Sequence, residues 1–215
     1  MKRSRVARPR VPRPYDMSLR ATHAAATRVD IIAAAHRLLD EPRGSALSLD
    51  EVARAAGVTR VTLYNHFGSR SALLAAVFED QGRVIGYERV RAAQALPDPR
   101  EALTSTLREL GRAWSAKRTA LRRTLALAVL DPEVEQLVMR YERYRRADIA
   151  ELAQRLARAA LLGHGLSGDE AAALLGTLTG FQFFDTLTLL DTSPAVATRR
   201  LIHLVTTALG VSAHH

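Results

Sequence analysis

The sequence predicts an all-α protein of about nine helices, on three observations. Apolar residues recur at helical spacing from about residue 27 to residue 209, as they do along one face of a helix. No segment alternates apolar and polar residues as a half-buried strand does. Capping residues, prolines and glycines divide the chain into segments of ordinary helix length. We therefore expect an N-terminal three-helix unit and a larger helical domain, which suits a length of 215 residues.

Residues 1–22 are predicted to form a flexible basic arm. The first 20 residues hold seven basic residues, one acidic residue and three prolines, Pro9, Pro12 and Pro14. Proline discourages a helix, and the segment has too little apolar surface to fold alone. Two interpretations stay open: a tail that aids solubility, or an arm that follows the DNA backbone.

Three helices are predicted within residues 23–72, each with its own start signal. Thr27 and Asp30 have the spacing of a capping box, and Ser48 and Glu51 repeat that spacing before the second helix. Thr59 can cap the third. The expected helices span residues 27–40, 49–55 and 60–66.

Six further helices are predicted from residue 70 onward. Ser69 can cap the first, and Asp131 followed by Pro132 can open another. The apolar run 171–190 is long enough to question as a membrane span, but Gln182, Asp185 and four threonines interrupt it. We therefore expect a buried core helix there and no membrane partner. The expected helices span residues 70–93, 99–116, 118–130, 132–161, 168–190 and 194–209.

The charge distribution indicates a polyanionic partner. The formal net charge is +9, and residues 1–70 hold 13 basic and 6 acidic residues, a balance of +7. Such a local excess attracts nucleic acid or an anionic membrane surface. The chain lacks cysteine, metal-ligand spacing of its histidines, and any nucleophile, phosphate-loop or dinucleotide motif. We therefore expect no catalytic residues, no metal and no cofactor, and a cytoplasmic protein, because no secretory signal is present.

Residues 49–66 have the layout of a helix-turn-helix, two short helices joined by a tight turn. Gly57 can take the positive φ that ends a helix abruptly. Leu63 and Phe67 lie about 40° apart on a helical wheel and define the buried side of the second helix. The outward set is then Val61, Thr62 and Asn65, with Arg60, Tyr64 and His66 on its flanks.

The segment SLDEVARAAGVTRVTLYNHFGSRSALL, residues 48–74, resembles the DNA-binding segment of the TetR family of bacterial transcriptional regulators. That family's pattern runs roughly T-x-x-x-I-A-x-x-A-G-V-S-x-x-T-L-Y-x-H-F-x-x-K-x-x-L, and its ending LY-x-HF is specific. Close resemblance covers about residues 27–78. Two positions depart: Arg70 replaces the usual Lys, and Val61 stands where Gly, Ala or Pro is more usual. The matching residues are Ser48, Val52, Ala53, Ala56, Gly57, Val58, Thr59, Thr62, Leu63, Tyr64, His66, Phe67, Arg70 and Leu73.

The resemblance implies a role in DNA binding for nine residues. Arg60 is the leading candidate for base readout, because Arg pairs bidentately with guanine. Three alternatives stay open: Tyr64 as a packing aromatic, His66 as a structural hydrogen bonder and Arg60 as a solvated charge. The implied phosphate contacts are Ser48, Thr59, Thr62, Tyr64, His66 and Arg70, and the implied base contacts are Arg60, Val61 and Asn65.

The resemblance further implies that residues 73–215 form a ligand-sensing and dimerisation domain. The helices 168–190 and 194–209 of two copies could build a four-helix interface, or could be core within a monomer. Trp114 and Phe181 could be plain core, and Asp185 could pair with an arginine. The candidate pocket residues are Trp114, Tyr141, Tyr144, Phe181, Gln182, Phe184 and Asp185. The candidate interface residues are Leu174, Leu178, Leu201, Leu204, Val205, Ala208 and Leu209.

The resulting hypothesis is a sequence-specific regulator that binds a near-palindromic operator in double-stranded DNA as a homodimer. It is expected to be a repressor that a small, mostly apolar effector releases. A dimeric DNA-binding regulator without an effector, and an activator, are the main alternatives. An enzyme and a basic membrane-surface protein are the rivals from other classes.

Overall fold

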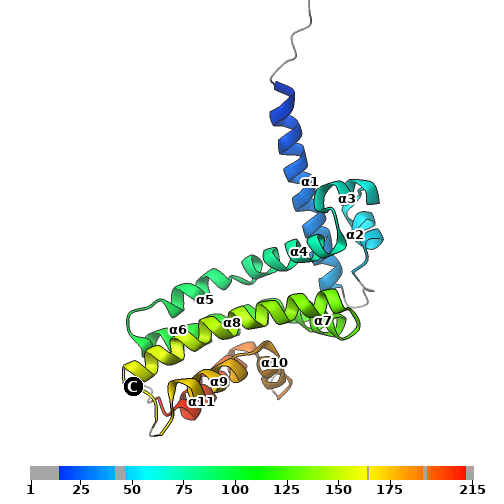
Figure 1. The fold of residues 1–215 in the computed structure, drawn as a ribbon. Helices are drawn as coiled ribbons and strands as arrows, with labels where there is room; N and C mark the ends of the chain where they lie inside the picture. Colours follow the sequence, from blue (N-terminus) through cyan, green and yellow to red (C-terminus); the bar gives the residue numbers. More distant parts are fainter. Residues whose placement is uncertain (1–14, 42–46, 164, 191–192, 212–215) are drawn as a thin grey trace, which may run out of the picture.

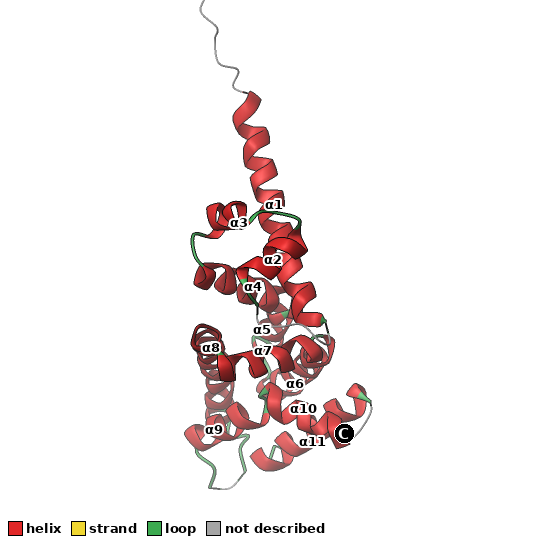
Figure 2. Ribbon diagram, turned by 90° about the vertical axis from the view of Figure 1, so that its right-hand side faces the viewer, coloured by secondary structure: helices red, strands yellow, loops and turns green. Residues whose placement is uncertain are grey.

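The computed structural model describes residues 15–41, 47–163, 165–190 and 193–211, which form helices joined by short connections (Figure 1). Figure 2 shows the same chain by secondary structure, and none of the described residues lies in a strand. The predicted all-α fold is confirmed. The helices are α1 (Tyr15–Asp40), α2 (Leu49–Ala56), α3 (Arg60–Phe67), α4 (Arg70–Ile85), α5 (Tyr87–Gln94), α6 (Pro99–Ala116), α7 (Arg118–Leu130), α8 (Pro132–Arg158), α9 (Gly168–Leu178), α10 (Phe181–Leu190) and α11 (Pro194–Leu209).

The helices form a small N-terminal unit above a layered body (Figure 1). α2 and α3 lie beside α1 and the start of α4, and α4 and α5 then run across the body. Beneath them, α6, α7 and α8 form a middle layer, and α9, α10 and α11 lie below that layer. The layers are in direct contact, since α5 packs on α6, α9 on α8 and α11 on α6. α4 therefore joins the N-terminal unit to the body.

A single apolar cluster, here called the head core, holds the N-terminal unit together. It combines side chains of α1–α4 with three residues from the body, so the two parts share buried surface. The predicted boundary after residue 72 falls inside α4, which contributes Leu73, Leu74 and Val77 to this cluster. The body residues in it are Ala120 of α7 and Val134 and Leu137 of α8.

The first helix begins earlier than predicted. α1 starts at Tyr15, so the expected start at residue 27 was wrong, as was the expected capping box of Thr27 and Asp30. Thr27 lies inside α1, where its hydroxyl donates to the carbonyl oxygen of His23 at 2.9 Å. No proline or glycine follows Tyr15 before the helix ends, and the alanines in between favour a helix. Residues 1–14 of the predicted arm lie outside the described residues.

Two predicted helices are each divided in two, which accounts for the eleven helices within the described ranges where about nine were expected. Gly86 separates α4 from α5 with a φ of 81°, a conformation that glycine adopts without strain. α9 ends before Thr179, whose carbonyl oxygen accepts from Trp114 Nε1 at 3.1 Å. Arg145 donates to the Thr179 hydroxyl at 2.6 Å. Both partners come from other helices and hold the chain at the break.

The other start signals behave as predicted. Ser48 and Glu51 form a capping box at α2, and the Thr59, Ser69 and Asp131 side chains cap α3, α4 and α8. Local spacing was therefore sufficient to place the beginnings of these helices.

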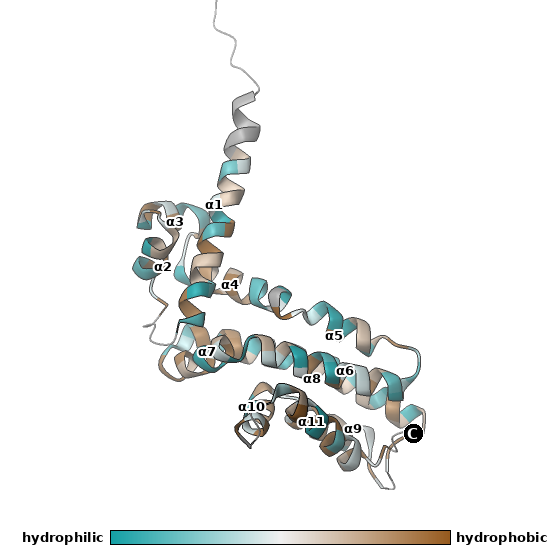
Figure 3. Cartoon of the chain, turned by 180° about the vertical axis from the view of Figure 1, so that it is seen from behind, coloured by the Kyte–Doolittle hydropathy of each residue, from teal (hydrophilic) through white to brown (hydrophobic). Residues whose placement is uncertain are grey.

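The end of the apolar run forms α10, which is buried on one side only, since Gln182 and Leu189 are exposed. Figure 3 shows α10 as largely apolar and α5 as largely hydrophilic. Phe184 of α10 is fully buried among residues of α6, α8, α9 and α11. Among the described helices, none combines the length and the apolar character needed to cross a bilayer.

Candidate functional site

α3 presents a polar face because its two apolar anchors point into the head core. Leu63 is 0% exposed and Phe67 is 8% exposed. Val61 and Tyr64 are 69% and 52% exposed, although both are large hydrophobic side chains. Tyr64 is therefore not a packing aromatic. The exposed residues of α3 are Arg60, Val61, Tyr64 and Asn65, while Thr62 and His66 are half-buried.

Arg28 of α1 fixes the far end of α3. Its guanidinium donates to the carbonyl oxygen of His66 at 2.9 Å and lies 4.2 Å from the centre of the Phe67 ring. A cation over an aromatic face is attractive, and the same side chain supplies a donor to a helix end that lacks one. The role of Arg28 could not be predicted from sequence spacing, because its hydrogen-bond partner His66 lies 38 residues away.

The start of α3 is capped by the neighbouring Thr59, and the first residue of the helix, Arg60, forms a weak ion pair. The Thr59 hydroxyl accepts from the backbone N–H of Thr62 at 3.1 Å. Arg60 pairs with Asp50 of α2 at 3.1 Å, and the two side chains are 61% and 60% exposed. Such exposed pairs contribute little, so Arg60 can leave Asp50 at small cost. The Ser48 hydroxyl is engaged by Glu51 within the α2 capping box.

Arg70 lies at the contact between α4 and α8. Its guanidinium donates to both carboxylate oxygens of Asp131 and, at 2.6 Å, to Glu133 Oε2. Hydrogen bonding by Arg70 is the main cause that lowers the pKa of Asp131. Glu133 also has a lowered pKa, owing to hydrogen bonds from Ser71 and Arg70. A phosphate contact by Arg70 therefore requires these carboxylates to release it.

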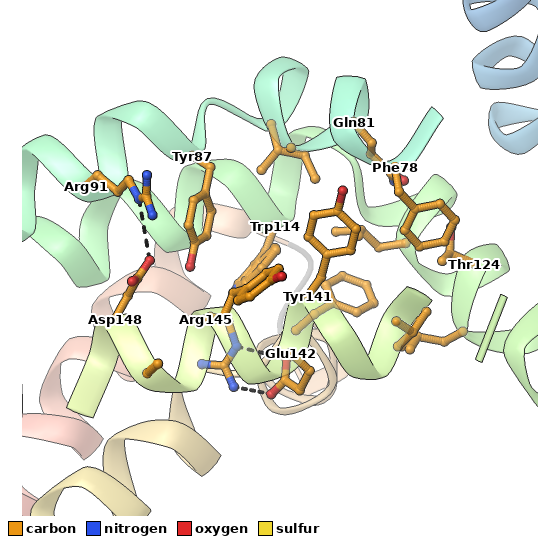
Figure 4. Close-up of a pocket in the computed structure, with 18 residues that line it drawn as sticks. Phe78, Gln81, Tyr87, Arg91, Trp114, Thr124, Tyr141, Glu142, Arg145 and Asp148 are labelled. Carbon is orange, nitrogen blue, oxygen red and sulfur yellow. Dashed lines mark hydrogen bonds and ion pairs between the residues drawn. The ribbon is translucent and has the colours of Figure 1, made fainter. Parts of the chain in front are cut away.

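A cavity of about 420 Å³ lies between α4, α5, α6, α7, α8 and α10 (Figure 4). Of the seven predicted pocket residues, Trp114, Tyr141, Tyr144 and Phe181 line it. The other three do not, and that part of the prediction was wrong. Gln182 is exposed, and Phe184 is fully buried in the body core.

Asp185 has a structural role in place of the predicted pocket role. Arg118 Nε and Arg122 Nε lie 2.6 Å and 2.8 Å from its carboxylate oxygens. The acid thus joins α10 to α7, which was the alternative left open for an acid in an apolar run.

The pocket also contains polar residues that sequence reasoning missed. Arg145 is 4% exposed and donates to Glu142, the Thr179 hydroxyl and the carbonyl oxygen of Gly176. These contacts connect the pocket wall to the break between α9 and α10. Gly86 before Tyr87 was the one usable signal, since a helix break there turns Tyr87 toward the cavity. The missed polar lining residues are Gln81, Tyr87, Arg91, Thr124, Glu142, Arg145 and Asp148.

The predicted interface stripe on α11 is mostly core of the single chain. Leu201, Val205 and Leu209 are 0% exposed, so as contacts with a second copy they were wrong. Helical periodicity identified one apolar face, and α6 and α9 cover it within the chain. Leu204 is 40% exposed and Ala208 is exposed beside it, while Leu174 and Leu178 of α9 are half-buried.

Comparison with known proteins agrees with this geometry. Residues 31–77 match the family model described as bacterial regulatory proteins, tetR family. An uncharacterised HTH-type transcriptional regulator of Mycobacterium tuberculosis is 38% identical over 96 residues, which are 43% of this chain and 46% of the relative. The chain thus aligns with less than half the length of that relative.

Solved structures extend the likeness of fold to nearly the whole chain. NalD of Pseudomonas aeruginosa, described as the secondary repressor of the MexAB-OprM multidrug efflux pump, has a TM-score of 0.66 at 24% identity. The similarity covers 90% of this chain and 100% of NalD. A TetR transcription regulator of Haloarcula marismortui has a TM-score of 0.67 at 14% identity, over 86% of this chain and 97% of that one. The match to the tetR family of bacterial regulatory proteins thus covers the segment that contains α2 and α3, and the solved structures share the fold of the rest of the chain.

Proposed function

We propose that this protein is a sequence-specific, DNA-binding regulator of transcription that acts in the cytoplasm. The observation that carries the proposal is the exposed face of α3, which buried Leu63 and Phe67 aim away from the head core. A short helix that presents donors, acceptors and a methyl-bearing side chain together suits the major groove of DNA. The basic excess of residues 1–70 supports a polyanionic partner.

The contacts divide into base readout and docking. Arg60 is proposed to leave Asp50 and pair with a guanine, with Val61 against a thymine methyl and Asn65 against an adenine. The docking contacts with phosphates are proposed to come from Ser48, Thr59, Thr62, Tyr64 and His66. The N-terminal arm would add phosphate contacts of its own.

Arg70 is proposed to link the DNA to the pocket. On an operator it would exchange Asp131 and Glu133 for a phosphate, since Arg binds either anion bidentately. α4 and α8, which Arg70 joins, also supply pocket walls through Gln81 and Tyr141. A ligand that favours one spacing of the two helices would therefore change the affinity for DNA, as a population shift requires. Repressor release by a small, mostly apolar effector follows from this proposal.

The functional unit is proposed to be a homodimer on a near-palindromic operator. Two copies of α3 would then lie about 34–36 Å apart, one turn of DNA. The exposed face with Leu204 and Ala208 on α11, beside α9, is the proposed interface. Light scattering at micromolar concentration should give a dimer, and Leu204→Glu a monomer. Leu130→Glu, at an exposed leucine of α7, is the matched control.

Selection of bound DNA from a random pool is the central test. A palindromic consensus with two half-sites is the expected result. Recovery of unrelated sequences would refute sequence-specific DNA binding. With the consensus known, Arg60→Ala should lose about 1–3 kcal/mol at one base pair per half-site. Equal losses on the consensus and on random DNA would show that Arg60 reads no base.

The sign of regulation is proposed as repression, by analogy with NalD, which is described as a repressor. A reporter gene behind the selected operator distinguishes this from activation, since deletion of the regulator raises expression only if it represses. A dimeric regulator without an effector is the second candidate. It predicts that occupation of the pocket leaves operator affinity unchanged.

A further inference from the structure

The pocket walls are aromatic, and this limits the shape of a ligand. Six aromatic rings surround the cavity, from α4, α5, α6, α8 and α10. Trp114 and Phe181 meet edge to face at 6.0 Å between ring centres, and Phe78 stacks on Tyr141 at 5.9 Å. Flat apolar groups fit between such surfaces. The six rings are those of Phe78, Tyr87, Trp114, Tyr141, Tyr144 and Phe181.

The charged side chains of the pocket leave no net charge for a ligand. Among the described residues that line it, the charged ones are two arginines and two acids. Arg145 pairs with Glu142, and Arg91 Nε lies 3.5 Å from Asp148 Oδ2. Burial alone would raise the pKa of Glu142, but the hydrogen bonds and positive charges of Arg145 and Arg146 together outweigh burial and lower it, so this acid stays ionised at neutral pH. An anionic or cationic ligand would lose its hydration without gaining an unpaired counter-charge.

Polar atoms without a hydrogen-bond partner mark the two ends of the pocket. Gln81 is 4% exposed and Thr124 is 5% exposed, yet Gln81 Nε2 and Thr124 Oγ1 have no hydrogen-bond partner among the described residues. In the described part of the chain the Tyr87 hydroxyl is likewise buried without a hydrogen bond, and Asp148 Oδ2 has only the ion pair with Arg91 at 3.5 Å. Figure 4 shows Gln81 and Thr124 at one end and Tyr87 and Asp148 at the other, with Trp114 between them. Buried polar groups are normally satisfied, so these atoms indicate what a ligand would supply.

We infer that the effector is an uncharged, elongated, aromatic molecule with a hydrogen-bonding group at each end. The inference rests on the proposed function, because it describes the ligand of that regulatory pocket. One end meets Gln81 and Thr124, and the other end meets the Tyr87 hydroxyl beside Asp148. The rings between them contact the middle of the ligand.

The state of Tyr87 agrees with this arrangement. Burial raises the pKa of Tyr87 to about 12, with the charge of Asp148 adding to the effect. The phenol therefore keeps its proton at neutral pH and can donate to a ligand acceptor as well as accept from a hydroxyl.

Trp114 provides a direct readout, because it is the single tryptophan of the chain and lies in the pocket wall. Four probes share one skeleton: diphenylmethane and its derivatives with two hydroxyl, two carboxylate or two aminomethyl groups at the para positions. Quenching of Trp114 fluorescence in the full-length protein gives each affinity. The diol is expected to bind most tightly, at least about 10-fold above the dicarboxylate and the diammonium probe. Tighter or equal binding of either charged probe, or no binding of the diol at millimolar concentration, would overturn the inference.

Tyr87→Phe tests the hydrogen bond at one end. The hydroxyl has no hydrogen-bond partner among the described residues, so its removal breaks none of the hydrogen bonds there and the variant should fold. Diol affinity should fall about 3- to 10-fold, the usual effect of one hydrogen bond, while diphenylmethane affinity stays the same. Tyr144→Phe is the control, because that ring lines the same pocket but is 59% exposed. Equal effects of Tyr87→Phe on both probes would contradict the assigned contact.

The binding assay contains no DNA, so its result is separate from the proposed function. Operator affinity is then measured with and without saturating diol. If the diol binds as expected and the operator stays bound, the pocket chemistry stands and the effector role fails. If a charged probe both binds more tightly and releases the operator, the effector role stands and the inference about ligand class fails.

Discussion

Replacing Glu133 by Gln is predicted to strengthen operator binding. In the free protein Arg70 donates to Glu133 at 2.6 Å and also to Asp131. If Arg70 contacts a phosphate in the complex, these bonds must open first, and the free energy needed opposes binding. Gln keeps the shape of Glu133 but removes its charge, so Arg70 is released more easily.

The expected size of the effect follows from solvent exposure. The side chains of Arg70 and Glu133 are 26% and 44% exposed, so solvent screens the pair and it contributes about 0.5 kcal/mol. Two protomers on one operator give about 1 kcal/mol, or about fivefold tighter binding. The free energy of unfolding should fall by about 0.5 kcal/mol per protomer, because the free protein loses the same interaction.

The assay is fluorescence anisotropy of a labelled operator at several salt concentrations. Glu133→Gln should leave the salt slope unchanged, because Arg70 reaches the same phosphate. Arg70→Gln should reduce the slope by about 0.9 per protomer, because one phosphate contact is lost. An unchanged affinity in Glu133→Gln would refute the exchange of partners by Arg70.

A matched control separates this effect from net charge. Glu151→Gln removes the same charge from the other end of α8, where Glu151 pairs with Arg158 at 2.7 Å and both side chains are 65% exposed. It should change operator affinity by less than Glu133→Gln. Equal tightening by the two variants would mean that overall charge, and not Arg70, is responsible.

Three further predictions concern the rest of the chain. Gly111→Ala should destabilise the fold by about 1–3 kcal/mol, because an added Cβ would lie 2.3 Å from Thr198 Oγ1. Adding Thr198→Ala should restore most of the lost free energy of unfolding, as measured by urea unfolding. No restoration would mean that the strain arises at another contact. Tyr64→Phe should weaken operator binding without changing unfolding, since its side chain is 52% exposed; identical anisotropy curves would exclude its hydroxyl from the interface. The free energy of unfolding should decrease as pH falls below about 4, since Arg70 lowers the folded pKa of Asp131 and this stabilisation is complete only above the unfolded pKa. Asp131→Asn should flatten that part of the profile, and an unchanged profile would contradict the assignment to Asp131.

The starts of α2, α3, α4 and α8 could be predicted from the sequence, but the start of α1 and the break at Thr179 could not. The capping box of Ser48 and Glu51 depends on residues three positions apart, so local spacing reveals it. The break at Thr179 depends on Trp114 and Arg145, which are 65 and 34 residues away. Such a break depends on the packing of distant helices, so the local hydrophobic pattern cannot predict it.

Some residues of the candidate site could likewise be predicted from local sequence, and others could not. The outward face of α3 could be predicted, because Leu63 and Phe67 fix it within one short helix. The interface residues on α11 could not, since an apolar stripe shows only that something covers it. Leu201 is buried by other helices of the same chain. The partner of Asp185 was equally hidden, since Arg118 lies 67 residues away along the chain.

The shared head core means that α2 and α3, the helices proposed to read DNA, are not an independent unit that can be exchanged. Ala120, Val134 and Leu137 close the cluster from α7 and α8, so a cut after residue 72 would leave apolar side chains in water and remove Leu73. A chimaera that joins α1–α3 to another regulator's body would need complementary side chains at these three positions. Retargeting this protein to a new operator is therefore better attempted by changing the exposed residues of α3 in place.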